Sequence, residues 1–216
     1  MNDILRARSI RGRHSFIRLL LRISISVICI RSMPALALEP LPSAIAAKMP
    51  SSHHVVANKS ADFDGNGLID YVVVIAHKNE AKMAELGSAP SRPLMVFLQQ
   101  QPSVFVLHAQ NTAIVYRVNE ASQCDPFLDT GDGLAARGAF FTVENGVACG
   151  GHWTDYITFK YAEKLGGFVF HKRISETWGM NDGTRGTDEA LVLQRRTVER
   201  AKSGSPVSLG AYRPSR

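Results

Sequence analysis

The sequence has few of the residues on which common enzyme and metal motifs depend. It holds three cysteines in 216 residues, none in a CxxC pair or a Cys/His cluster, which argues against a cysteine-based zinc site. It has no HExxH motif, no GxSxG elbow, no P-loop and no GxGxxG turn. Aromatic residues make up 8% of the chain and are not interleaved with basic ones, so no stacking platform for nucleic acid is expected.

A net positive charge is also missing from most of the chain. Residues 1–37 contain seven arginines and one acid, Asp3, which together account for the whole net charge of +6. The remaining residues are therefore neutral overall. The high isoelectric point belongs to the N-terminal segment and gives no argument for a nucleic-acid partner.

The N-terminal segment has the organisation of a secretory signal peptide. A basic region precedes the apolar stretch Leu19–Ile30, and Ala35-Leu36-Ala37 supplies small residues for signal peptidase. We expect cleavage after Ala37, a linker at 38–52, and a bacterial protein that is periplasmic or secreted. The alternative is an uncleaved anchor or an amphipathic helix. Since the apolar run is too short to span a bilayer, no stable membrane insertion is expected after cleavage.

Cleavage would leave two cysteines, Cys124 and Cys149. An even number in an exported chain favours a disulfide. It would close a loop of about 25 residues and contribute on the order of 3 kcal/mol in the chain-entropy model. Two buried free thiols are the alternative.

Short apolar runs separated by turn residues predict a mainly β fold. We expect antiparallel sheets of about eight to nine short strands with few helical turns, in a single domain at 53–216. The run Ile69–His77 is apolar and β-branched almost throughout, which is typical of a strand buried on both faces. The other expected strands are 54–57, 93–99, 104–109, 112–117, 139–144, 155–162, 168–175 and 190–195, with helical turns at 43–49 and 80–86 and a loop at 178–188.

The most informative motif is the loop Asp62-Phe-Asp-Gly-Asn-Gly-Leu-Ile-Asp70. Calcium takes six to eight oxygen ligands, and a loop with an oxygen-bearing residue at every second position can supply them. Gly65 and Gly67 allow the tight curl that this requires. The expected ligands are the side chains of Asp62, Asp64, Asn66 and Asp70 and the backbone carbonyl of Leu68. The alternatives are a metal-free Asp/Asn/Gly turn, or a loop too weak to hold calcium at ambient concentration.

The loop is not an EF-hand. Its twelfth position is Val73, where an EF-hand needs a bidentate glutamate, and an apolar strand follows in place of a helix. A calcium-sensing switch is therefore not expected.

Residues Ala61–Val74 resemble the calcium loop of FG-GAP/VCBS-type repeats, in which a strand also follows the loop. The wider chain is similar to a family of exported bacterial proteins that carry a single such loop. This resemblance implies calcium, a β fold and an exported location. The segments that carry it are Arg92–Leu98, Asp125–Phe127, Gly150–Trp153 and Tyr156–Tyr161.

Two further groups are candidate sites. Asp125, Asp129 and Asp132, with His152, suggest a carboxylate/histidine cluster for a hydrolase. A solvated Asp/Gly turn is the simpler interpretation of the three acids. The turn before Trp153 can present His152 and Trp153 to a ligand, or it can bury Trp153 against the disulfide.

We therefore expect a non-enzymatic, calcium-stabilised β module that binds a protein or glycan partner. A periplasmic hydrolase using the 125–152 cluster is the alternative. An inhibitor or accessory factor of a cell-envelope enzyme is a third possibility.

Overall fold

The computed structural model describes residues 40–120, 125–127, 133–146, 152–183 and 189–215. Residue contacts divide the chain into two units, Met1–Ala35 and Leu36–Arg216, and the second is described here by itself. No helix in the described part of the chain is long and apolar enough to cross a membrane.

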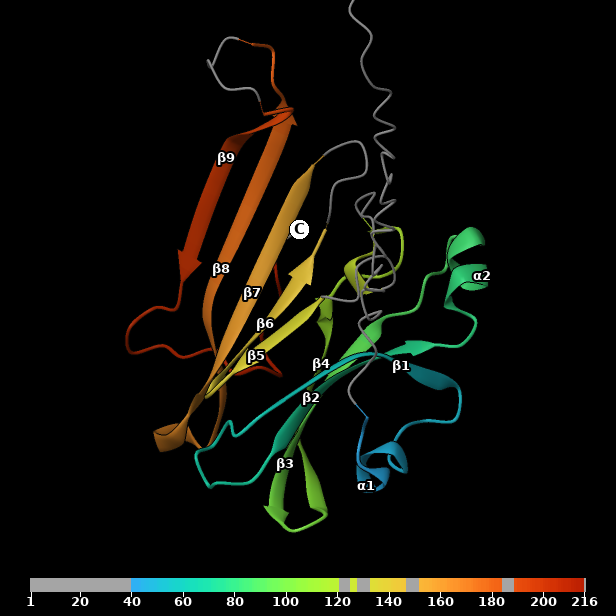
Figure 1. Ribbon diagram of the computed structural model, residues 1–216, viewed down its shortest axis with the longest axis vertical. Helices are drawn as coiled ribbons and strands as arrows, with labels where there is room; N and C mark the ends of the chain where they lie inside the picture. Colours follow the sequence, from blue (N-terminus) through green and yellow to red (C-terminus); the bar gives the residue numbers. More distant parts are fainter. Residues whose placement is uncertain (1–39, 121–124, 128–132, 147–151, 184–188, 216) are drawn as a thin grey trace, which may run out of the picture. The chain divides into compact units, whose positions relative to one another are not determined.

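Four antiparallel strands form the first sheet, drawn in blue to green (Figure 1), in the order β1-β2-β3-β4. A single-turn helix, α1, precedes it, and a second short helix, α2, connects β2 to β3. The bounds are α1 Ser43–Ala46, β1 His53–Ala61, β2 Asp70–His77, α2 Glu80–Glu85, β3 Arg92–Gln101 and β4 Val104–Val115.

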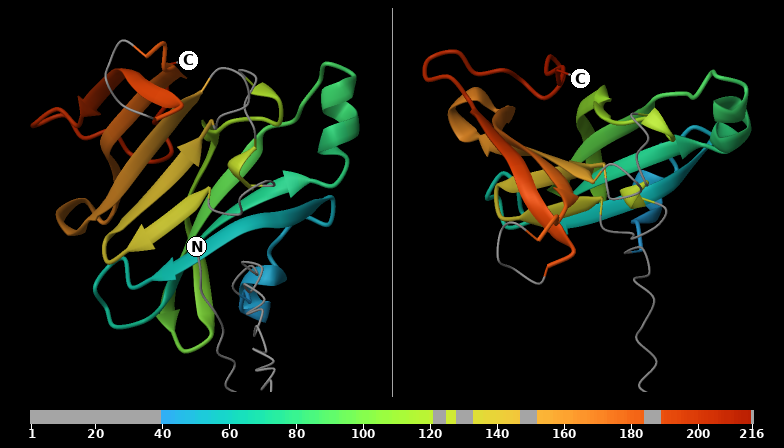
Figure 2. Two further views of the ribbon diagram at one scale, coloured as in Figure 1. Left: turned by 45° about the horizontal axis from the view of Figure 1, so that its top comes forward. Right: turned by 90° about the horizontal axis from the view of Figure 1, so that it is seen from above.

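Five antiparallel strands form the second sheet, in the order β5-β6-β7-β8-β9. A short 3-10 turn, η3 Glu163–Leu165, joins β7 to β8. Strands β8 and β9 form a long hairpin, which the further views follow in orange and red (Figure 2). The bounds are β5 Leu134–Arg137, β6 Phe140–Asn145, β7 Trp153–Ala162, β8 Gly167–Met180 and β9 Leu191–Arg200.

The main core contains residues from both sheets. Val72 and Val74 of β2 belong to the same buried cluster as Phe141 and Val143 of β6. The alternate residues of β2, Val73 among them, belong to a second cluster with Ile45 of α1. β2 is thus buried on both faces, as its unbroken apolar run predicts.

The predicted fold class is confirmed: the chain is mainly β, with nine strands in two antiparallel sheets and only short helical turns among the described residues. Three details were wrong. The two strands expected at 104–109 and 112–117 are one strand, β4. The polar Asn111 lies between the two predicted ranges; it is buried, and its amide donates to the carbonyls of Leu209 and Tyr212.

The other two errors concern the second sheet. β5 was not predicted, because its Leu-Ala-Ala-Arg sequence lacks the β-branched residues that mark a strand. β8 continues to Met180, past the expected start of a loop at 178, because residues 178–180 pair with β9.

Candidate functional site

The acidic loop connects β1 to β2. The pairing of Ala61 with Asp70, the first residue of β2, closes it. Gly65 and Gly67 have φ angles of +78° and +84°, a left-handed conformation that favours glycine. These two glycines let the backbone curl so that acidic side chains far apart along an extended chain come together.

Three carboxylates of this loop converge. Each of Asp62, Asp64 and Asp70 offers one ligand atom, and these atoms lie within 4.8 Å of one another. Like charges this close repel unless a cation lies between them. An all-oxygen donor set is also the one that a hard cation prefers. The cluster can therefore hold a metal ion.

Asp70 fixes the position of the cluster because both of its oxygens accept backbone hydrogen bonds. One accepts from the N–H of Phe63 at 2.9 Å, and the other from the N–H of Gln99 in β3 at 2.8 Å. The side chain is fully buried. Burial raises the pKa of Asp70 and the nearby charge of Asp64 adds to this effect, whereas the two backbone N–H groups oppose it. A bound cation would offset the cost of this buried charge.

The side chain of Asn66 links the loop to the neighbouring strand. Its Oδ1 accepts the N–H of Leu68 at 2.7 Å, and its amide donates to Asp64 at 3.2 Å and to the Gln99 carbonyl at 3.0 Å. Asp62 accepts the N–H groups of residues 65 and 67. The structure thus brings the three predicted carboxylates together, while Asn66 and Leu68 remain predicted ligands.

Phe63, between two of the acids, anchors the loop in the core. It is 1% exposed and packs edge-on against Phe141 and Phe168 of the second sheet, with ring centroids 6.1 and 5.4 Å away. The spacing of the expected ligands predicts no role for this residue. An aromatic side chain inside an otherwise polar loop is the signal that points to burial.

A buried ion-pair network lies beside α2. Arg92, at the start of β3, is fully buried and donates from Nε to one oxygen of Glu80 at 2.9 Å and from a terminal nitrogen to the other at 2.7 Å. The same terminal nitrogen pairs with Asp125, and the guanidinium lies 6.0 Å from the Phe127 ring centroid. Two of the segments that carry the family resemblance, 92–98 and 125–127, therefore meet at Arg92.

Several predicted residues lie outside the described part of the chain. Asp125 is described, and the Arg92 network engages its carboxylate. The predicted residues that the structure does not describe are Cys124, Cys149, Asp129 and Asp132. The disulfide and the hydrolase cluster therefore stay predictions.

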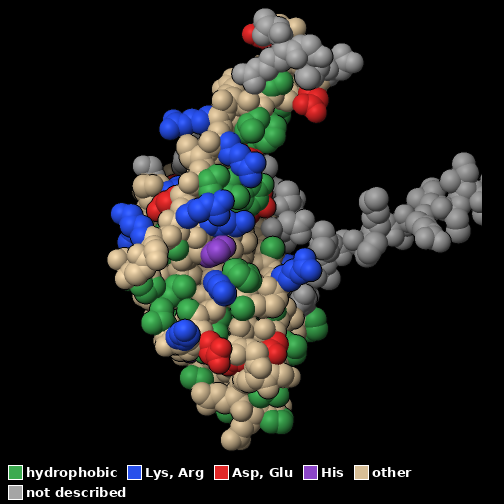
Figure 3. Space-filling view, turned by 90° about the vertical axis from the view of Figure 1, so that its left-hand side faces the viewer, with side chains coloured by type: hydrophobic (Ala, Val, Ile, Leu, Met, Phe, Trp, Pro, Cys, Tyr) green, Lys and Arg blue, Asp and Glu red, His purple; other side chains and the backbone are tan. Residues whose placement is uncertain are grey.

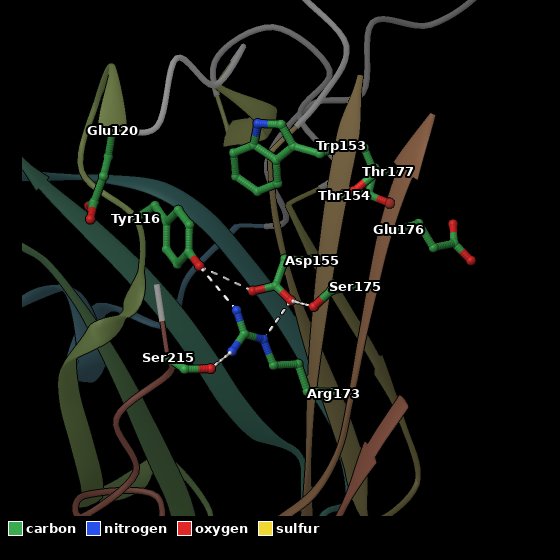
Figure 4. Close-up of a pocket in the computed structure, with 10 residues that line it drawn as sticks. All are labelled: Tyr116, Glu120, Trp153, Thr154, Asp155, Arg173, Ser175, Glu176, Thr177 and Ser215. Carbon is green, nitrogen blue, oxygen red and sulfur yellow. Dashed lines mark hydrogen bonds and ion pairs between the residues drawn. The ribbon is translucent and has the colours of Figure 1, made fainter. Parts of the chain in front are cut away.

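Trp153, the first residue of β7, lines a cavity of about 280 Å³ (Figure 4). Its ring lies 5.8 Å from that of Tyr116, which follows β4. At the base, Asp155 accepts from Arg173 Nε and from the Ser175 hydroxyl, both at 2.7 Å. The cavity thus has an aromatic wall and a polar base in which the arginine and aspartate charges are paired. His152 is not among its lining residues; its carbonyl accepts the backbone N–H of Trp178 at 2.7 Å.

No protein-family model, curated protein or solved structure matches this chain. The class that its fold and site define is a two-sheet antiparallel β protein with an acidic loop that can hold a metal ion.

Proposed function

We propose that this protein is an exported, calcium-stabilised β module with a binding or cell-envelope accessory role and no catalytic activity. The observation that carries the proposal is the convergence of three aspartates in a glycine-curled loop directly before a buried strand. Calcium is the cation that such a loop suits, because Mg²⁺ demands stricter octahedral geometry and keeps more of its waters. The missing twelfth-position ligand implies a modest affinity.

The ion would act on folding because the loop is attached to both layers of the core. Asp70 bonds the backbone of β3, and Phe63 packs among aromatic residues of the second sheet. An ion bound only by this arrangement adds its binding free energy to the stability of the fold. The Trp153 cavity offers a place for a ligand, and the Asp155 carboxylate that accepts the Ser175 hydroxyl there is already paired with Arg173.

Calorimetric titration with calcium tests the site itself. We expect one ion per chain and an affinity at least about tenfold lower in Asp64→Asn, because the variant loses a charged oxygen ligand but keeps its size. Glu85→Gln is the matched control, since Glu85 is exposed on α2 and far along the chain from the loop. Equal affinities for the two variants, or no calcium binding by the wild type, would contradict the assignment.

A further inference from the structure

A basic band crosses the second sheet. We define it by five residues on four strands: Arg137, Lys160, His171, Lys172 and Arg200. Figure 3 shows Lys and Arg side chains gathered around a histidine on one face of the molecule. The chain beyond residue 37 is neutral overall, so this concentration of charge is a local arrangement.

Strand register places the cations of the band in two neighbouring rows. In one row, Phe140 of β6 is paired with Arg137 of β5 and with Lys160 of β7. In the next row, Thr158 is paired with Lys172, which is paired in turn with Arg200 of β9. Residues two apart on a strand share a face, and neighbouring strands lie about 4.8 Å apart. The rows therefore form one continuous surface.

The cations of the band are not neutralised by described neighbours. The ion pairs that Arg92, Arg173 and Arg196 form include no residue of the band. Burial lowers the pKa of His171, and the positive charges of Lys172, Lys160 and Arg200 lower it further. The charges of these three side chains therefore all reach the His171 imidazole.

A hollow of about 290 Å³ lies within the band. Its lining includes Arg137, Lys172, and the hydroxyls of Thr142 and Thr158, which are 2.9 Å apart. Two hydroxyls that share one hydrogen bond retain one O–H that can donate to a ligand. The hollow thus combines positive charge with a free hydroxyl donor.

From this arrangement we propose that the outer face of the second sheet binds an acidic polysaccharide, whose carboxylate or sulfate groups meet the basic band and whose hydroxyls meet the threonines. A chain with repeated charges fits better than a single anion, because the cations extend from β5 to β9. This identifies the partner for the proposed binding role and does not depend on the calcium site.

Single-stranded nucleic acid fits the band less well. Phe140 is the aromatic ring at its centre, but the Lys160 ammonium lies 5.5 Å from its centroid and His171 packs edge-on against it at 5.3 Å. Its ring is therefore engaged within the protein and is a poor stacking platform for bases.

Binding to immobilised polygalacturonate and heparin tests the proposal, with neutral dextran as the background surface. The full chain is used at about 0.15 M salt and saturating calcium. We expect saturable binding to the acidic polymers, weakened about tenfold or more in the double variant Lys172→Glu/Arg200→Glu, because like charges would then face the ligand. The matched control is Lys78→Glu/Lys82→Glu, which changes the net charge equally at exposed positions near α2. All variants keep residues 1–37, so the arginines of that segment contribute equally to each.

The proposal would be overturned if the two double variants lost polysaccharide binding equally, or if the protein bound dextran as well as the acidic polymers. Tighter binding of single-stranded DNA or anionic lipid vesicles than of either polysaccharide would also overturn it. Each variant's melting temperature is measured in calcium and in chelator. Loss of polysaccharide binding with an intact calcium response separates failure at the band from failure at the acidic loop.

Discussion

Replacing Arg92 by methionine is expected to destabilise the protein by about 3–5 kcal/mol. The side chain is fully buried, and its removal leaves the carboxylates of Glu80 and Asp125 without their cation in a site shielded from water. Urea unfolding measures the effect. Neutralising the whole network, in Arg92→Met/Glu80→Gln/Asp125→Asn, should recover part of the loss, because the buried charges are then gone.

The matched control for this prediction is Arg196→Met, which removes the partner of Glu176 from a pair whose arginine side chain is 53% exposed. Solvent screens such a pair, so its loss should cost less than about 1 kcal/mol. Similar losses for the Arg92 and Arg196 variants would show that the buried network does not stabilise the fold.

Phe63→Ala should also be strongly destabilising, by about 3–5 kcal/mol, because it leaves a cavity among the aromatic residues that join the loop to the second sheet. It should also weaken calcium binding, since the Phe63 backbone donates to Asp70 and the side chain holds that backbone in place. Urea unfolding and calcium titration of the same variant measure the two effects.

Two further variants serve as controls for the destabilisation expected of Phe63→Ala. Phe63→Leu should lose less stability than Phe63→Ala, because leucine keeps most of the buried apolar volume. Leu86→Ala, at a side chain that is 75% exposed, should change stability by no more than about 0.5 kcal/mol. A Phe63→Ala variant as stable as Leu86→Ala would mean that the loop is not anchored in the core.

The fold class could be predicted from the sequence because period-two patterns and turn residues are local signals. β2 is the clearest case, since its apolar run reflects burial on both faces. β5 was missed because only four residues pair there and none is β-branched. β4 was divided in two because burial of Asn111 depends on carbonyls near residue 210, about one hundred residues away.

The candidate metal site could also be predicted from the sequence only in part. The spacing of Asp62, Asp64 and Asp70 and the two glycines were sufficient to predict that the carboxylates converge. The bond from Gln99 to Asp70 and the aromatic contacts of Phe63 were not predictable, because they depend on which strands become neighbours.

The Arg92 network shows the same limit. Arginine is mostly exposed in folded proteins, so nothing local indicates that Arg92 is buried or identifies Glu80 and Asp125 as its partners. The basic band likewise exists only once strand register brings cations from β5 to β9 onto one face.

The most direct test of the calcium-stabilised module is thermal unfolding of the protein in millimolar calcium and in chelator. At a calcium concentration of about one hundred times the dissociation constant, the ion should contribute about 2.7 kcal/mol. For a domain of this size, that corresponds to a rise in melting temperature of roughly 5–10 °C. Magnesium at the same concentration should produce a smaller rise. An unchanged melting temperature in calcium would contradict the account.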